Sequence, residues 1–442
     1  MIYLAFLLFF VFDYLRPGSY IPGLDALKLN ALVPATAILG TFFGKPPVSF
    51  KDSLAETNTK ILLTLLALLA FSTVFATVTL SAYTVTKNVF AYILIYWVLI
   101  RQVGDLKRLR QVFLTLTFVH LAIAALNPRL FTNPDSRLGI NSGAFLGDGN
   151  DFSLSVNICI PLCLFLMLES RRIFTKLLWI AALLALVLCV VATKSRGGTL
   201  ALAAVLLYFW VKSQRKVLMA AVSATVVAFV LAMAPASYFE RMDMIADTEE
   251  GSAQGRILAW KASLKMAASN PLMGVGAGHF PMAYGNANTR WMTAHSIYFL
   301  LLGELGLPGL FVLLTLIGYN LAANRLLQSE LKRLPGPQAV TAGNILACTS
   351  ASLVAFATGG AFLSAAYYPH TYVLAGLLAA TRRIVRQQLA QGAAPVEGPA
   401  PAVTALAPAF PLLAPGVVSP EWRPRPASNG ALYRRRPMSS LS

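Results

Sequence analysis

Residues 177–210, LLWIAALLALVLCVVATKSRGGTLALAAVLLYFW, decide the fold, because two long apolar runs flank one short polar junction. A helix needs roughly 17–25 apolar residues to cross the hydrocarbon layer of a bilayer, and these runs approach or reach that length. A soluble chain usually carries about 25% charged residues. This chain carries 12% charged and 57% hydrophobic residues. The sequence therefore predicts an all-α, polytopic integral membrane protein.

Apolar runs broken by charged or Pro/Gly-rich segments predict about twelve transmembrane helices in all. The fourth, eighth and twelfth runs give the weakest apolar signals. Met1–Phe12 has no basic n-region and no small-residue cleavage site, which indicates a retained first span rather than a signal peptide. The expected limits are 1–15, 29–44, 61–79, 88–101, 111–127, 152–168, 177–193, 197–211, 217–234, 295–320, 341–360 and 364–381.

The distribution of lysine and arginine predicts the orientation. One set of alternate short loops, together with the start of the tail, holds nineteen basic residues, and the other set of short loops holds seven. The positive-inside rule places the richer set in the cytoplasm, so both termini are expected there. The long segment 235–294 is then expected to face outward and to contain short helices. Because the basic residues are dispersed over short loops, the net charge of +18 does not indicate a nucleic-acid-binding domain.

Composition also divides the chain into two regions. Residues 1–386 carry the apolar runs and are expected to form one transmembrane domain. Residues 387–442 hold ten of the 25 prolines and many alanines, and we expect a disordered cytoplasmic tail that cannot bury a core. All four cysteines lie in predicted spans, and buried apolar thiols are their expected state.

The outward segment contains the first candidate site residues. Ser252 can cap a helix that runs to about Ser269. On that helix Arg256 and Trp260 are four residues apart and share a face, so the indole can lie over the guanidinium. From spacing alone, an arginine that meets water or lipid headgroups is the more common case.

His295 and Arg196 lie at the outward ends of predicted spans. A histidine there can take a proton from a hydroxyl, although it can also snorkel to the headgroups. His370, near the outer end of the last span, is the second candidate base. Arg196 sits between two spans with almost no loop, and an arginine at that depth is costly unless it is paired or hydrated.

The charge count places Arg196, Arg256 and His295 on one face of the membrane. Two arginines that stay ionised and offer planar forks suit a phosphate or diphosphate. Glu304, two and a half turns below His295, is expected either to pair with an arginine or to hydrogen-bond within the bundle. The glycines of Gly274–Gly278 lack a surrounding strand–turn–helix unit, so they indicate a flexible turn rather than a dinucleotide site.

These motifs resemble those of the O-antigen ligase and polymerase superfamily of bacterial inner-membrane glycosyltransferases. Its subgroup of O-glycosylation ligases, which is associated with exosortase systems, is the most similar in layout over residues 1–385. One departure is Ser296, where the family often has Asn after its catalytic histidine. The matching segments are SRGG (195–198), S-x-x-x-R-x-x-x-W (252–260), NPLMGVGAGHF (270–280), AHSIYFLLLGELGLPGL (294–310), FLGDGNDFSLSVNICIPL (145–162) and YLRPGSYIP (14–22).

The resemblance implies transfer of a glycan from an undecaprenyl diphosphate carrier to a hydroxyl of a lipid, glycan or protein acceptor, on the periplasmic face of the inner membrane. His295 would be the general base, and Arg196 and Arg256 would hold the carrier diphosphate. Trp260, Glu304 and His370 are possible supporting residues. This chemistry of lipopolysaccharide or exopolysaccharide synthesis requires no cofactor and, if the arginines supply the charge, no metal.

Two other functions fit the membrane layout. A polymerase that joins repeat units on the same carrier would share the base and the arginines and would differ in its acceptor. A flippase or transporter for the lipid-linked glycan would be expected to show paired broken helices and charges spread along a path. The sequence shows instead a cluster at one face and no obvious internal repeat, which favours glycosyl transfer over transport.

Overall fold

The computed structural model describes residues 1–75, 78–132, 146–235, 238–239, 251–288, 291–332 and 336–393. Throughout these ranges the regular secondary structure is helical, and no strand occurs in them, as the all-α prediction requires. Most of the tail, 394–442, and parts of the outward segment lie outside the described residues.

In the described part of the chain, each of the twelve expected spans overlaps one helix, and the first of these helices continues into a π-helical turn (η1, Val11–Leu15). They are α1 Ile2–Phe10, α2 Leu29–Phe43, α4 Thr57–Phe75, α5 Thr79–Gln102, α6 Leu106–Leu126, α8 Gly149–Glu169, α9 Ile173–Ala192, α10 Arg196–Lys212, α11 Lys216–Met233, α15 Ile297–Leu331, α16 Pro337–Gly360 and α17 Pro369–Ala393. The remaining elements are η2 Pro17–Ser19, η3 Leu24–Leu27, α3 Phe50–Ala55, α7 Arg129–Thr132, α13 Gly251–Ser269 and α14 Phe280–Asn288.

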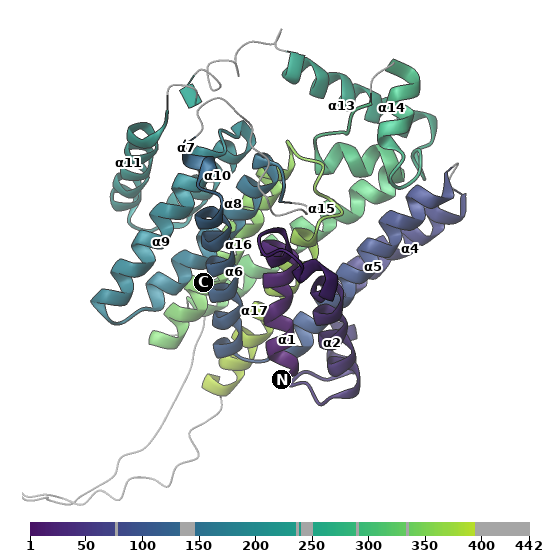
Figure 1. Ribbon diagram of the computed structural model, residues 1–442. Helices are drawn as coiled ribbons and strands as arrows, with labels where there is room; N and C mark the ends of the chain where they lie inside the picture. The colour runs from purple at the N-terminus through teal and green to yellow at the C-terminus, as the bar shows by residue number, and fades with distance from the viewer. Residues whose placement is uncertain are drawn as a thin grey trace, which may run out of the picture. The chain divides into compact units, whose positions relative to one another are not determined.

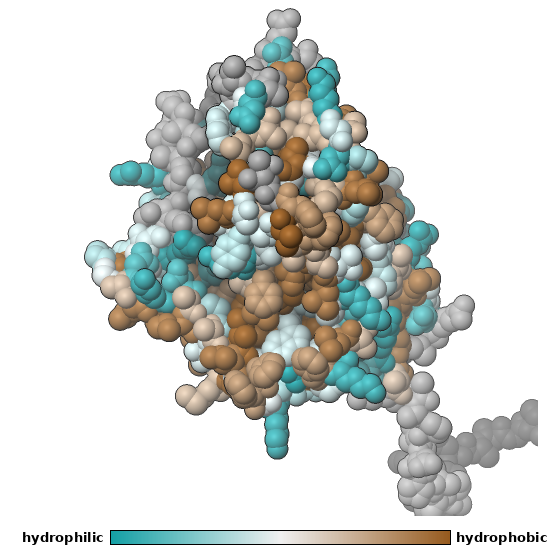
Figure 2. All heavy atoms as spheres, turned by 90° about the vertical axis from the view of Figure 1, so that its right-hand side faces the viewer, coloured by the Kyte–Doolittle hydropathy of each residue, from teal (hydrophilic) through white to brown (hydrophobic). Residues whose placement is uncertain are grey.

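Ten segments of the described chain are long and apolar enough to cross a membrane. Two of the twelve helices, α10 and α17, do not belong to these ten candidate spans. α10 has 17 residues, and α17 carries Arg382, Arg383 and Arg386. Large apolar side chains are exposed along the candidate spans, for example Leu63 and Phe71 on α4 and Phe90 on α5. Figure 2 shows such hydrophobic side chains over the face on which α4 and α5 lie, as expected for a surface solvated by lipid.

α8 is the most buried of the candidate spans and packs against α6, α9, α10 and α16 (Figure 1). Close approach to α16 is possible because Gly359 has no side chain, and a Cβ there would meet Leu154 at 2.7 Å. All four cysteines are free and buried, as predicted. The bundle therefore has a tightly packed centre around α8, against which α10 and α16 lie.

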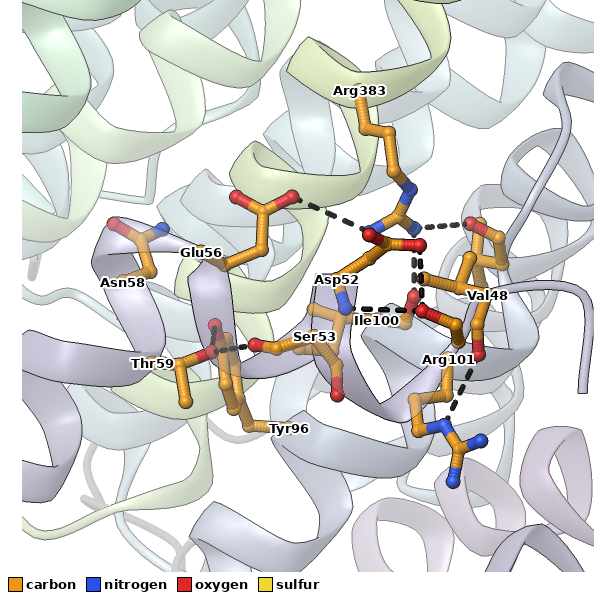
Figure 3. Close-up of polar contacts among 12 residues, drawn as sticks. Val48, Asp52, Ser53, Glu56, Asn58, Thr59, Tyr96, Ile100, Arg101 and Arg383 are labelled. Carbon is orange, nitrogen blue, oxygen red and sulfur yellow. Dashed lines mark hydrogen bonds and ion pairs between the residues drawn. The ribbon is translucent and has the colours of Figure 1, made fainter.

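α17 is fixed to the bundle by its arginines. Arg383 donates to the backbone oxygens of Ile100 at 2.7 Å and Val103 at 2.9 Å, and it forms an ion pair with Glu56 at 3.4 Å (Figure 3). Arg382 is buried and donates to Asn320 at 2.6 Å. The helix continues past residue 387, where the tail was expected to begin, and ends at Ala393.

Candidate functional site

The Arg196 junction forms the start of α10. Ser195 caps the helix: its side-chain oxygen accepts from the N–H of Gly198 at 3.1 Å and donates to Asn150 at 2.8 Å. A Cβ at Gly198 would collide with Ser153 on α8. The glycines of the SRGG motif therefore let α10 begin directly against α8, and this places Arg196 in the first turn of a packed helix rather than in a loop.

α13 carries Arg256 and Trp260, and Figure 1 shows it with α14 at one end of the bundle. The Trp260 ring stacks on Phe299 with a centroid distance of 5.1 Å and an interplanar angle of 12°. Its Nε1 donates to the carbonyl oxygen of Ala294 at 3.0 Å. Trp260 thus binds the helix of Arg256 to the residue that precedes His295. The proposed stacking of Trp260 over Arg256 stays a prediction.

His295 has a left-handed backbone conformation, with φ of 47°, directly before α15. Its N–H donates to the side-chain oxygen of Ser364 at 2.8 Å. The next residue, Ser296, caps α15 by accepting from the N–H of Phe299 at 3.5 Å. Asparagine and serine are equally good N-caps, so Ser296 can perform the same capping role as the asparagine common in the family.

The segment 361–368 between α16 and α17 connects these pieces. Phe362 lies against the start of α10, because a Cβ on Gly197 would be 3.2 Å from its side chain. The same ring is 6.5 Å from the ring of Trp260. With Ser364 bound to His295, this turn touches the elements that carry Arg196, Arg256 and His295.

Our prediction of a span from 364 to 381 was wrong at its start. α17 begins at Pro369, a residue that favours the first turn of a helix. The preceding residues form turns after the Gly359-Gly360 pair that ends α16. Ser364 was missed because its surroundings read as the start of a span. Phe362 lay in the short predicted break between two spans, where the residue pattern gives no sign of its contacts with Gly197 and Trp260. The glycine pair and the proline were visible signals that this break is longer.

Glu304 hydrogen-bonds within the bundle, which is one of the two alternatives considered. Its carboxylate accepts from the N–H of Gly278 at 2.9 Å, the N–H of Phe280 at 3.1 Å and the hydroxyl of Tyr367 at 2.9 Å. Burial, and then the Glu304 carboxylate, raise the pKa of Tyr367 well above its usual value, so the hydroxyl keeps the proton that it donates. Glu304 therefore acts as an anchor for the segment that follows α13.

The glycine-rich turn is fixed rather than flexible, which corrects our interpretation. Its three glycines all have positive φ, and Gly276 donates to the Glu304 carbonyl oxygen at 2.9 Å. Opposite this turn, α15 is interrupted at Gly306, where φ is 67°. The N–H of Leu307 there donates to Pro271 at 2.8 Å. Glycine is needed at these positions because other residues rarely adopt positive φ.

One family model matches the chain. Residues 180–314 match the O-antigen ligase family. The matched range supports a place in the O-antigen ligase superfamily and includes Arg196, Arg256, Trp260, His295 and Glu304. This family implies a membrane glycosyltransferase-like enzyme. A comparison with curated proteins finds no match.

His370 lies outside the range that matches the O-antigen ligase family and is buried at the start of α17. Its ring is 5.9 Å from that of Tyr14 and lines a cavity of about 20 Å³ together with His120 and Ser155. A cavity of this size holds about one water molecule, so it has no room for the sugar that would carry the acceptor hydroxyl. The geometry favours His295 over His370 as the candidate base.

Proposed function

We propose that this protein transfers a glycan from an undecaprenyl diphosphate carrier to an acceptor hydroxyl, at a site formed by Arg196, Arg256 and His295. The observation that carries the proposal is the contact of three separate elements with the turn at Phe362 and Ser364. These elements are the start of α10, the helix α13 and the residue before α15. The match of residues 180–314 to the O-antigen ligase family supports the same reaction class.

In this reaction the acceptor oxygen attacks the anomeric carbon of the donor sugar. The bond between that carbon and the phosphate oxygen breaks, and its electrons leave with the diphosphate. The acceptor proton passes to a ring nitrogen of His295, which serves as general base. The hydrogen bond from the His295 N–H to Ser364 fixes the backbone from which this ring projects.

The two arginines hold the leaving diphosphate. Guanidinium groups form paired hydrogen bonds with phosphate oxygens and stay protonated at any physiological pH. Arg196 lies in the first turn of α10, so the partial positive charge at that helix N-terminus adds to the positive field. Because these groups supply positive charge where the leaving group develops negative charge, we expect no metal requirement.

The proposed site faces the periplasm, with both termini in the cytoplasm of a bacterial inner-membrane protein. The basis is the charge distribution of the short loops. The acceptor is a hydroxyl of a lipid, glycan or protein, and the exosortase-associated subgroup would favour a protein. Because the donor is carried by a membrane lipid, it can reach a site at the ends of membrane helices by diffusing within the bilayer.

The test uses the purified full-length protein in nanodiscs with an undecaprenyl diphosphate-linked glycan, candidate acceptors and EDTA. His295→Ala, Arg196→Ala and Arg256→Ala are compared with the wild type, and Arg129→Ala, an exposed arginine on α7, is the matched control. We expect each site variant to lose at least about 100-fold in transfer rate, as for removal of a general base or of charge stabilisation. The control should keep full activity.

The products distinguish the related reactions. Transfer to a lipid or protein acceptor indicates ligation, whereas lengthening of the carrier-linked glycan indicates a polymerase. Full activity of His295→Ala would disprove the assignment of the base. Movement of the lipid-linked glycan across the bilayer without any transfer would replace the enzyme proposal with transport.

A further inference from the structure

A basic cleft lies at the far ends of the helices that carry the candidate site. It is bounded by the end of α10, the end of α15 and the start of α16, and its volume is about 750 Å³. α10 runs 17 residues from Arg196 to Lys212, a rise of about 26 Å. The cleft is therefore separate from the proposed diphosphate site and lies on the side that the charge distribution predicts to be cytoplasmic.

Of the residues that the structure describes, three cations line this basic cleft: Lys212 from α10, and Arg325 and Lys332 from α15 and its end. Lys212 experiences the charges of both others, which shows that they gather at one place. In the part of the chain that the structure describes, none of the three forms an ion pair. Three like charges that share a cleft repel one another, so a bound anion would relieve the repulsion.

The neighbouring acidic groups are engaged elsewhere or face away. Glu169 forms an ion pair with Arg110 and accepts from Thr341 at 2.9 Å. Glu330 is exposed and does not line the cleft. Gln328 and Ser329 add polar groups to the lining. Among the described residues, the wall of the basic cleft thus offers cations and hydrogen-bond donors and contains no carboxylate.

The opposite wall is apolar and belongs to α16. Ala339, Val340, Gly343 and Ala347 line it, so the lining extends two to three helical turns into the helix. A Cβ added at Gly343 would meet no atom within 4 Å, which shows open space beside this position. A cationic rim that continues into an apolar groove matches a ligand with an anionic head and a hydrocarbon chain.

We propose that the basic cleft binds the phosphate-bearing headgroup of an anionic membrane lipid, with an acyl chain along α16. The phosphate group is the chemistry shared with free inorganic phosphate. The apolar wall favours binding of a lipid, because a soluble ion has no hydrocarbon chain to pack against it. Basic pockets between membrane helices on the cytoplasmic side are suited to anionic headgroups.

The charge test measures binding of phosphatidylglycerol, phosphatidylcholine and inorganic phosphate to the full-length protein in neutral detergent, by native mass spectrometry and by thermal unfolding. We expect phosphatidylglycerol alone to bind tightly and to raise the Tm. The triple variant Lys212→Gln, Arg325→Gln, Lys332→Gln should bind it at least about tenfold more weakly. The control variant Lys51→Gln, Arg172→Gln, Lys176→Gln removes three exposed charges outside the cleft and should bind like the wild type.

A steric test leaves the charges in place. Gly343→Leu fills the groove beside the apolar wall, and Gly318→Leu is its control, because a Cβ at Gly318 also meets nothing within 4 Å but does not line the cleft. Gly343→Leu should weaken phosphatidylglycerol binding several-fold and Gly318→Leu should not. Equal loss in both charge variants would overturn the proposal. The proposal would also be overturned if inorganic phosphate displaced phosphatidylglycerol completely and Gly343→Leu bound phosphatidylglycerol as well as the wild type does.

Discussion

Ser364 holds His295 in a backbone conformation that few residues adopt. Non-glycine residues rarely have positive φ, and such conformations persist where the surroundings determine them. Here the determinants are the hydrogen bond from the His295 N–H to Ser364, the bond from Trp260 to Ala294, and the cap at Ser296. The backbone conformation at the candidate base is therefore set by residues that do not themselves take part in proton transfer.

Ser364→Ala should lower kcat by about fivefold and change KM little, because loss of one hydrogen bond of about 1 kcal/mol frees the His295 backbone. Ser364→Thr keeps the hydroxyl and should restore most of the activity. Steady-state transfer kinetics, with thermal unfolding to verify the fold, measure both. Unchanged kcat in Ser364→Ala would show that the ring does not depend on this bond.

At the scale of elements, α15 is two helical segments joined at Gly306. The break allows the turn after α13 to dock, since Val275 and Gly276 donate to the backbone oxygens of Gly303 and Glu304 at 2.9 Å each. The Glu304 carboxylate then holds the turn from the other side. The helix α13 is thereby positioned by α15, the same element that follows His295.

Gly306→Ala should destabilise the protein by more than about 2 kcal/mol, because alanine disfavours positive φ and its Cβ would collide with the Pro271 oxygen. Gly318→Ala, in a regular part of the same helix with open space around it, should instead stabilise by about 0.5–1 kcal/mol. Thermal unfolding of both variants gives the comparison. Equal Tm values for the two variants would show that the break in α15 tolerates alanine and does not require glycine.

The extent of successful prediction differs between elements for a physical reason. An apolar run long enough to cross a bilayer is itself the signal for a helix, so each expected range overlaps one helix. Residues 364–368 were mistaken for the start of a span because their composition resembles one, and Ser364 acts through a partner 69 positions away. The glycine turn appeared flexible because sequence spacing gives no sign of the Glu304 carboxylate that fixes it.

At the scale of the whole molecule, the charge distribution predicts which loops face the cytoplasm. The four native cysteines are buried, so single cysteines introduced at the surface can be labelled against a low background. Arg129→Cys should react with a membrane-impermeant maleimide in intact spheroplasts, and Lys176→Cys should react only after permeabilisation. The reverse pattern would invert the topology and move the proposed site to the cytoplasm.

The length of α10 has a consequence for the surrounding bilayer. A rise of about 26 Å is shorter than a hydrocarbon layer of about 30 Å, and a membrane adapts to a short helix by local thinning. Beside the Arg196 junction, the headgroup plane would then dip toward the protein interior. The polyprenyl-linked donor that we propose would diffuse laterally into this depression and present its diphosphate near the depth of the arginine. Less energy would then be needed to lift the carrier out of the lipid phase.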